Sequence, residues 1–210
     1  MIDVFSTPDV FSKKALQDGK AVSAQKIVEE AAIKRIVKNN EIHKIKAKAL
    51  DDLCERPKKN EQWRIITEKQ FNAYALILSV LNVELIEELW IAIYRINQPT
   101  VDSIIDLIES GRILRGGFII SNFFNQTKKP ELWARKLKSF CEKNDNFGHC
   151  CTHNHAKVIL IKTKNEYLIF EGSGNMSDNA RIEQYLYENN KEVFNFHKKW
   201  IKNLIESHGK

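Results

Sequence analysis

The sequence has no apolar run long enough to cross a membrane. A transmembrane helix needs roughly 20 mainly apolar residues, and no run in this 210-residue chain approaches that length. The first nine residues also lack the basic and then apolar pattern of a secretory signal peptide. These absences predict a cytoplasmic protein without a transmembrane segment, and membrane association is not expected.

Cysteine is scarce, and its spacing fits neither a disulfide framework nor a zinc site. The four cysteines are Cys54, Cys141, Cys150 and Cys151. They include no C-x-x-C pair, so we interpret them as reduced, mostly buried thiols. His149 and His153 flank two of them and raise the alternative of zinc. Adjacent residues of a strand point to opposite faces, however, and no second ligand pair follows. We therefore predict no metal and no cofactor.

The charge of the chain is unevenly distributed. The formal net charge is +6, with an acidic middle and two basic ends. A basic excess favours a polyanionic partner such as nucleic acid, or an anionic membrane surface, although a moderate excess also simply aids solubility.

Two helical patterns precede a break in the chain. Apolar residues recur at helical spacing over residues 23–37 and 41–54, and lysines lie opposite the second apolar stripe. That lysine face is either a solvated helix surface or a contact arm for nucleic acid or a second chain. The Pro57 region interrupts the pattern. Residues 1–60 are therefore predicted to be a helical extension, and residues 61–210 the main domain.

Strand and helix patterns alternate in the first part of the main domain. Strands are expected at residues 63–66, 85–96 and 113–121 and before residue 155, and helices at residues 71–81, 99–110 and 130–143. This alternation is typical of α/β folds with parallel crossovers. It predicts a mixed, largely parallel sheet flanked by helices on both faces. A helix that carries Glu183 and a final amphipathic helix are expected near the end.

The most informative stretch runs from His155 to Glu183. Two β-branched and aromatic apolar runs, separated by a polar turn, predict a hairpin within it. Residues i and i+2 of a strand share a face, so His155 and Lys157 point the same way. The second strand of the hairpin returns Ser173 and Asn175 to that same end.

These residue types suit the binding of one phosphoryl group. Lys157 supplies a compact cation, and Ser173 and Asn175 supply neutral donors. Gly172 and Gly174 would let backbone amides approach an anion closely. The loop and the lysine together therefore predict a phosphate site.

A histidine beside a phosphate site can be a nucleophile, a general acid or a general base. As a nucleophile, His155 would need one unprotonated and correctly aimed ring nitrogen. Glu183 is the candidate to hold the other nitrogen, as a carboxylate does in a hydrolase triad.

The order His155-x-Lys157 and then Gly172-Ser173-x-Asn175 resembles the H-x-K…G-S-x-N signature of the phospholipase D superfamily. Glu183 stands where many members carry a glutamate that orients the histidine. One position departs from the pattern, because Lys162 replaces the aspartate usually found five residues after the lysine.

The resemblance implies a phospholipase D-like fold for residues 61–210 and a phosphodiesterase that works without metal through a phosphohistidine. His155 would be the nucleophile, and Lys157, Ser173 and Asn175 would bind phosphate. The chain carries a single H-x-K motif that is followed by a G-S-x-N motif. By resemblance to single-motif members, two chains would form a homodimer in which both copies of His155 face one phosphate.

Further substrate contacts are expected beyond strand ends, where ligands gather in open α/β sheets. The candidates are Arg95, Asn97, Ser121, Asn122 and Asn125, which could equally be turn or capping residues. Phe118, Phe123 and Phe124 could stack on bases or pack in the sheet core.

Three function classes remain open from the sequence. A nuclease that acts on DNA or RNA is favoured by the basic ends and the small size. A phospholipid enzyme should carry an apolar membrane-facing segment, which we do not find. A non-catalytic nucleic-acid-binding or dimerisation module on the same fold is the third.

Overall fold

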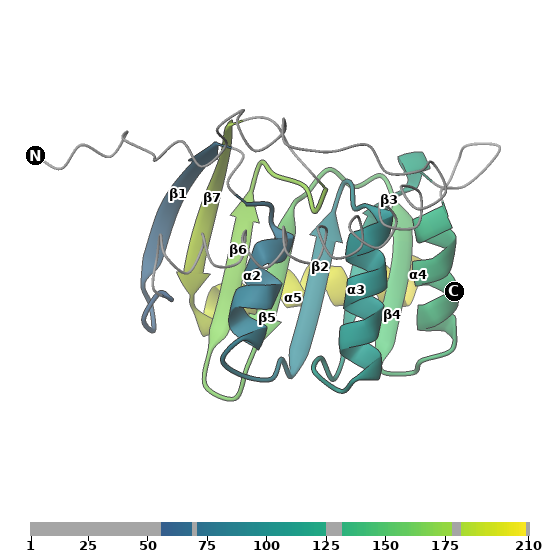
Figure 1. Ribbon diagram of the computed structural model, residues 1–210, viewed down its shortest axis with the longest axis horizontal. Helices are drawn as coiled ribbons and strands as arrows, with labels where there is room; N and C mark the ends of the chain where they lie inside the picture. Colours follow the sequence, from purple (N-terminus) through teal and green to yellow (C-terminus); the bar gives the residue numbers. More distant parts are fainter. Residues whose placement is uncertain (1–55, 69–70, 125–131, 178–181, 209–210) are drawn as a thin grey trace, which may run out of the picture. The chain divides into compact units, whose positions relative to one another are not determined.

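The computed structural model describes residues 56–68, 71–124, 132–177 and 182–208 (Figure 1). These described residues form one mixed sheet of seven strands in the order β1-β7-β6-β5-β2-β3-β4. Nearly all of the predicted helical extension, residues 1–55, lies outside the described residues.

The strands and helices expected between residues 63 and 170 are all present, with ends shifted by a few residues. The strands are β1 (Gln62–Glu68), β2 (Glu88–Ile93), β3 (Gly116–Ser121), β4 (Phe147–Thr152), β5 (Val158–Lys162), β6 (Tyr167–Gly172) and β7 (Ile182–Asn189). The helices are α2 (Tyr74–Leu81), α3 (Gln98–Glu109), α4 (Leu132–Glu142) and α5 (Lys191–His208), with a short 3-10 turn, η2 (Asn122–Phe124).

The sheet is mixed, but the prediction that it is largely parallel is wrong. Only the pairs β2–β3 and β3–β4 are parallel among these strands. The β2–β5, β5–β6, β6–β7 and β1–β7 pairs are antiparallel. The alternating pattern correctly indicated crossover helices between β2 and β4. The later strands are joined by short connections, which favour antiparallel neighbours.

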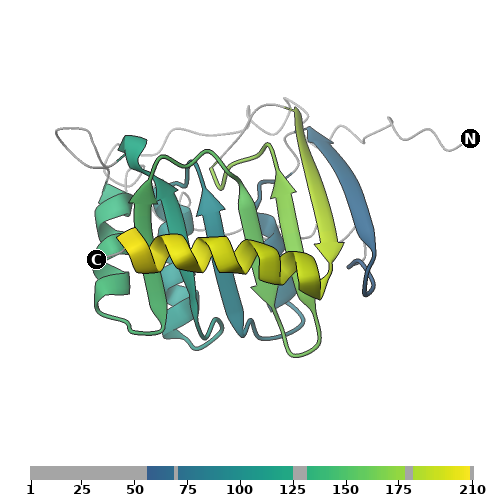
Figure 2. The ribbon, with the colours of Figure 1, turned by 180° about the vertical axis from the view of Figure 1, so that it is seen from behind.

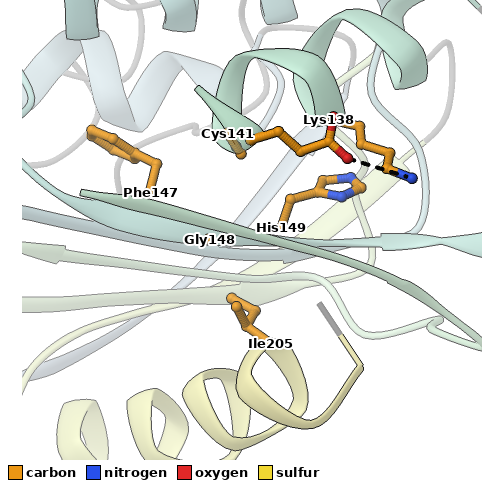
Figure 3. A pocket seen from close by; sticks show the side chains of 7 residues that line it. Lys138, Cys141, Phe147, Gly148, His149 and Ile205 are labelled. Atoms are coloured by element: carbon orange, nitrogen blue, oxygen red, sulfur yellow. Dashed lines mark ion pairs between the residues drawn. The ribbon is translucent and has the colours of Figure 1, made fainter. Parts of the chain in front are cut away.

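Helices cover both faces of the sheet, as predicted. Helices α2, α3 and α4 lie on one face, and α5 crosses the other (Figures 1 and 2). Each face has its own apolar core, and Cys150 and Cys151 contribute to opposite cores, as expected of adjacent strand residues. Helix α5 packs so closely on β4 that a Cβ at Gly148 would overlap the Ile205 side chain (Figure 3).

Glu183 lies on strand β7, so the prediction of a helix around it is wrong. Along β7 the residues alternate between exposed and covered, and Glu183, Tyr185 and Tyr187 all face the core side. This period of two, together with the tyrosines, is the signature of a strand. The pairing of β7 with both β1 and β6 completes the sheet at this point.

Candidate active site

A cleft of about 740 Å³ lies at one end of β5, β6 and β7. Val158 of β5 pairs with Glu171 of β6, so the residues just before β5 and just after β6 must meet at the same edge. The cleft is lined by Tyr94, His155, Ala156, Lys157, Val158, Glu171, Gly172, Ser173, Asn175, Ile182 and Glu183. The structure therefore brings together all five side chains that were predicted to be catalytic.

Lys157 reaches back to His155. Its Nζ donates a hydrogen bond to the His155 carbonyl oxygen at 2.9 Å and lies 3.4 Å from the His155 Nδ1. Burial lowers the pKa of Lys157, and the opposing charge of Glu183 offsets only part of that shift. The cation is thus held beside the imidazole.

Ser173 links the loop after β6 to strand β7. Its hydroxyl donates a hydrogen bond to the carboxylate of Glu183, which is only 8% exposed. The same oxygen accepts a hydrogen bond from the Gln184 backbone N–H at 3.1 Å. These contacts fix the Ser173 rotamer. The role of Glu183 in orienting His155 stays a prediction.

Asn175 ties the same loop to the end of β2. Its side-chain oxygen accepts a hydrogen bond from the Arg95 backbone N–H at 3.0 Å. The next residue, Met176, donates its backbone N–H to the Arg95 carbonyl at 3.1 Å. The Asn175 oxygen is therefore occupied by the fold, and its amide nitrogen is the end that can donate to a phosphate.

The two glycines of the loop allow it to lie close to β7. A Cβ at Gly172 would overlap the Gln184 carbonyl, and one at Gly174 would overlap the Tyr185 hydroxyl. The Gly172 N–H donates to the Lys157 carbonyl, and the Ser173 N–H donates to Gln184. These two amides are used within the sheet, and the close contacts with β7 give both glycines a packing role; anion contacts from the loop stay a prediction.

The secondary candidates lie outside the cleft lining. Arg95 is exposed beyond β2, and Asn122 begins the short turn after β3. Asn97 caps α3 by accepting a hydrogen bond from the Thr100 N–H at 3.0 Å. Ser121 accepts one from the Phe123 N–H at 3.3 Å. Asn125 lies outside the described residues.

Tyr94 is a cleft residue that the sequence did not single out. It follows β2, and its ring lies 4.7 Å from the His155 ring, centroid to centroid. The Lys157 Nζ lies 5.4 Å from the Tyr94 centroid, within the range of a cation–π contact. The only signal for Tyr94 in the sequence was its position just past a buried strand, because the H-x-K…G-S-x-N motif does not include an aromatic residue.

Lys162, the departure from the family pattern, lies at the far end of β5 from His155. Its ammonium pairs with the Glu87 carboxylate. Lys162 lies four residue steps along the strand from Val158, which corresponds to about 13 Å. Lys162 therefore takes part in an ion pair away from the cleft and does not line it.

A second, smaller pocket of about 170 Å³ lies beside β4 (Figure 3). Burial lowers the pKa of His149 in this pocket to about 4, with a further contribution from nearby Lys138. Lys138 pairs with Glu142 at 3.7 Å. Within the described residues, no group of three or more side chains is arranged to hold a metal ion. None of the described helices is both long and apolar enough to cross a bilayer.

No protein-family model matches the chain, and no curated protein sequence matches it. Among solved structures it resembles Nuc from Salmonella typhimurium, a phospholipase D family member. The TM-score is 0.51, with 14% identity over 71% of this chain and 97% of Nuc. It also resembles the archaeal chromatin protein TrmBL2, with a TM-score of 0.50 and 14% identity over 89% of this chain and 66% of TrmBL2.

A third structure, NucT from Helicobacter pylori, aligns with a TM-score of 0.49 and 21% identity over 71% of this chain and 99% of NucT. The similarity to Nuc shows that the chain shares the fold of this phospholipase D family member. A shared fold does not by itself establish an activity, which has to be argued from the site.

Proposed function

We propose that the chain is a phosphodiesterase that cleaves nucleic acids through His155. The observation that carries this proposal is the meeting of His155, Lys157, Ser173, Asn175 and Glu183 in one cleft, on a phospholipase D-like fold. The set contains a nucleophile, a cation and two neutral donors, which are the groups that phosphoryl transfer requires.

In the first step, an unprotonated ring nitrogen of His155 attacks the phosphorus atom. A P–N bond forms, the P–O bond to the leaving alcohol breaks, and the leaving oxygen takes a proton from a general acid. Lys157, Ser173 and Asn175 would hold the non-bridging oxygens and stabilise the charge that develops on them. The Lys157 ammonium would have to exchange its contacts with His155 for contacts with phosphate.

In the second step, water attacks the phosphohistidine. The P–N bond breaks, the water proton passes to a general base, and the phosphate monoester leaves. The loss of the phosphoryl group regenerates the imidazole for the next cycle. The covalent intermediate divides one difficult displacement into two easier steps.

We propose that the general acid is the His155 of a second chain. The sequence contains the combined H-x-K…G-S-x-N signature only once, and a twofold interface would present the same histidine from the opposite side of the phosphate. In the second step that histidine would act as the general base. The active form would then be a homodimer.

The test compares the full-length chain with its His155→Ala variant in excess EDTA. Substrates are single- and double-stranded DNA, RNA, bis(p-nitrophenyl) phosphate and phosphatidylcholine vesicles, and the mass in solution is measured first. His153→Ala is the matched control, because His153 is exposed nearby and does not line the cleft. We expect the parent and the control to cleave nucleic acid and the His155 variant to be inactive.

Cleavage that survives in the His155 variant would contradict the mechanism. Cleavage of the vesicles alone would indicate that the chain is a phospholipid enzyme and not a nuclease.

A non-catalytic nucleic-acid-binding module is the second candidate. The observation that favours it is the similarity to TrmBL2, whose structure is described as showing a novel mode of DNA binding. A folded chain that binds DNA but cleaves no substrate in the same experiment would support this alternative.

A further inference from the structure

Phe123 is a large and mostly exposed aromatic side chain. It lies in η2, just past the end of β3, and is 61% exposed. By contrast, Phe118 of the same strand–turn segment is fully buried in the core. A single exposed aromatic residue is common on protein surfaces, so the argument depends on what lies next to it.

Phe123 continues a row of rings that starts at the predicted nucleophile. The Tyr94 ring lies 4.7 Å from the His155 ring and 6.4 Å from the Phe123 ring, centroid to centroid. Both separations lie within the range of aromatic contacts. We call Phe123 and Tyr94 the aromatic shelf. It leads from the cleft, where Lys157 and His155 lie, to an exposed ring outside it.

We infer that the aromatic shelf binds a nucleobase of a single-stranded nucleic acid close to the phosphate that is cleaved. This inference rests on the proposed function, because it assigns a substrate class to the same cleft. Stacked nucleotides rise by roughly 3.4 Å per residue. The two ring separations therefore place Phe123 within about three nucleotides of a phosphate at His155.

Single strands fit the aromatic shelf better than duplexes do. Every base offers a π-face on which an aromatic side chain can stack, without any dependence on sequence. In a duplex those faces are already covered by neighbouring base pairs, and exposing one costs unpairing and unstacking energy. An exposed ring beside a phosphate site therefore selects strands whose bases are free.

The test measures binding rather than cleavage, in a His155→Ala background so that the strand stays intact. Fluorescence anisotropy compares a labelled oligothymidine strand with a strand of equal length in which abasic sites replace the bases, and with the oligothymidine strand annealed to its complement, in DNA and RNA forms. Each strand is titrated with the background protein and with the same protein carrying Phe123→Ala, Phe123→Tyr or Phe196→Ala. Phe196 is the matched control, because it is 68% exposed on α5 and outside the cleft.

We expect Phe123→Ala to weaken binding of the base-containing strand by about 5- to 150-fold, the usual effect of losing one stacked base. Binding of the abasic strand should not change, Phe123→Tyr should retain the affinity, and Phe196→Ala should have no effect. Equal weakening of both strands, no weakening of either, or tighter binding of duplex than of single strand would overturn the inference. If the parent cleaves no substrate but Phe123→Ala still weakens binding of the base-containing strand, the proposed nuclease function is wrong. The inference that the aromatic shelf binds a nucleobase would still hold.

Discussion

At the scale of single residues, the environment of Lys157 decides the charge available to a phosphate. Burial lowers its pKa, and the carboxylate of Glu183 raises it by a smaller amount. Lys157 also touches His155 directly, with its Nζ 3.4 Å from the His155 Nδ1. Glu183 comes from β7, and Lys157 comes from the segment just before β5.

The pH profile of phosphodiester hydrolysis should report this balance. We expect activity to fall as the pH rises, and to do so at a pH below 10.5, the ordinary pKa of lysine. The reason is that the pKa of Lys157 is lowered, so its ammonium loses the proton at a lower pH. Glu183→Gln should move this alkaline limb to lower pH, because it removes the charge that raises the pKa. The measurement is kcat/KM for bis(p-nitrophenyl) phosphate across the alkaline range.

Glu171→Gln is the control for that profile. Glu171 lines the same cleft, but its charge does not contribute to the pKa of Lys157. An alkaline limb that stays in place in Glu183→Gln, or that moves equally in Glu171→Gln, would argue against Lys157 as the titrating group.

At the scale of elements, strand β7 shapes the loop that follows β6. Tyr185 of β7 packs under Gly174, and its ring stacks on Phe170 of β6 at 4.5 Å. Among the described residues its buried hydroxyl has no hydrogen-bond partner. The loop is thus positioned by this close contact, which a glycine permits, together with the hydrogen bonds of Ser173 and Asn175.

Gly174→Ala should displace Ser173 and Asn175 and lower kcat/KM by about 100-fold, the usual result of misplacing catalytic groups by about 1 Å. Adding Tyr185→Phe should restore part of the activity, because it removes the oxygen that the new Cβ would overlap. The Tyr185 ring carbon Cζ, 2.7 Å from that Cβ, remains in the way.

Tyr185→Phe alone should retain both activity and stability, because the hydroxyl that it removes makes no hydrogen bond in the described structure. Steady-state kinetics and thermal unfolding of the three variants provide the measurement. If the double variant is no more active than Gly174→Ala, the overlap with Tyr185 is not the cause of the loss.

At the scale of the whole molecule, one chain supplies one histidine to the cleft. Among the residues that line it, His155 is the only imidazole. A two-step mechanism needs a proton donor for the leaving oxygen as well as a nucleophile. A second chain related by a twofold axis would provide it, and each active site would then depend on both chains.

Mixed dimers test this dependence. If each site needs two copies of His155, unfolding and refolding the parent with an excess of His155→Ala chains should lower activity with the square of the parent fraction. Independent sites would instead lose activity in direct proportion to that fraction. Activity of refolded mixtures gives the answer, and an excess of His153→Ala chains serves as the control. A monomer with full activity would contradict the dimer outright.

The strongest sequence predictions came from local patterns. The hairpin of β5 and β6 and the meeting of His155, Lys157, Ser173 and Asn175 at one end follow from strand periodicity alone, and the structure confirms them. The prediction of a helix around Glu183 was wrong: the eight residues of β7, Ile182–Asn189, follow a polar stretch and alternate as a strand does. Its partner β1 lies far away in the sequence, with Gln62 paired to Glu188.

The sequence by itself determined the chemical groups of this protein, the α/β class and the spacing that returns those groups to one edge of a hairpin. Only the tertiary structure decided that Glu183 receives the Ser173 hydroxyl, that Tyr94 lies against His155 and that Phe123 remains exposed. The physical reason is range. Strand periodicity acts between neighbouring residues, whereas these contacts depend on which distant strands pair and on which side chains the packed helices leave uncovered.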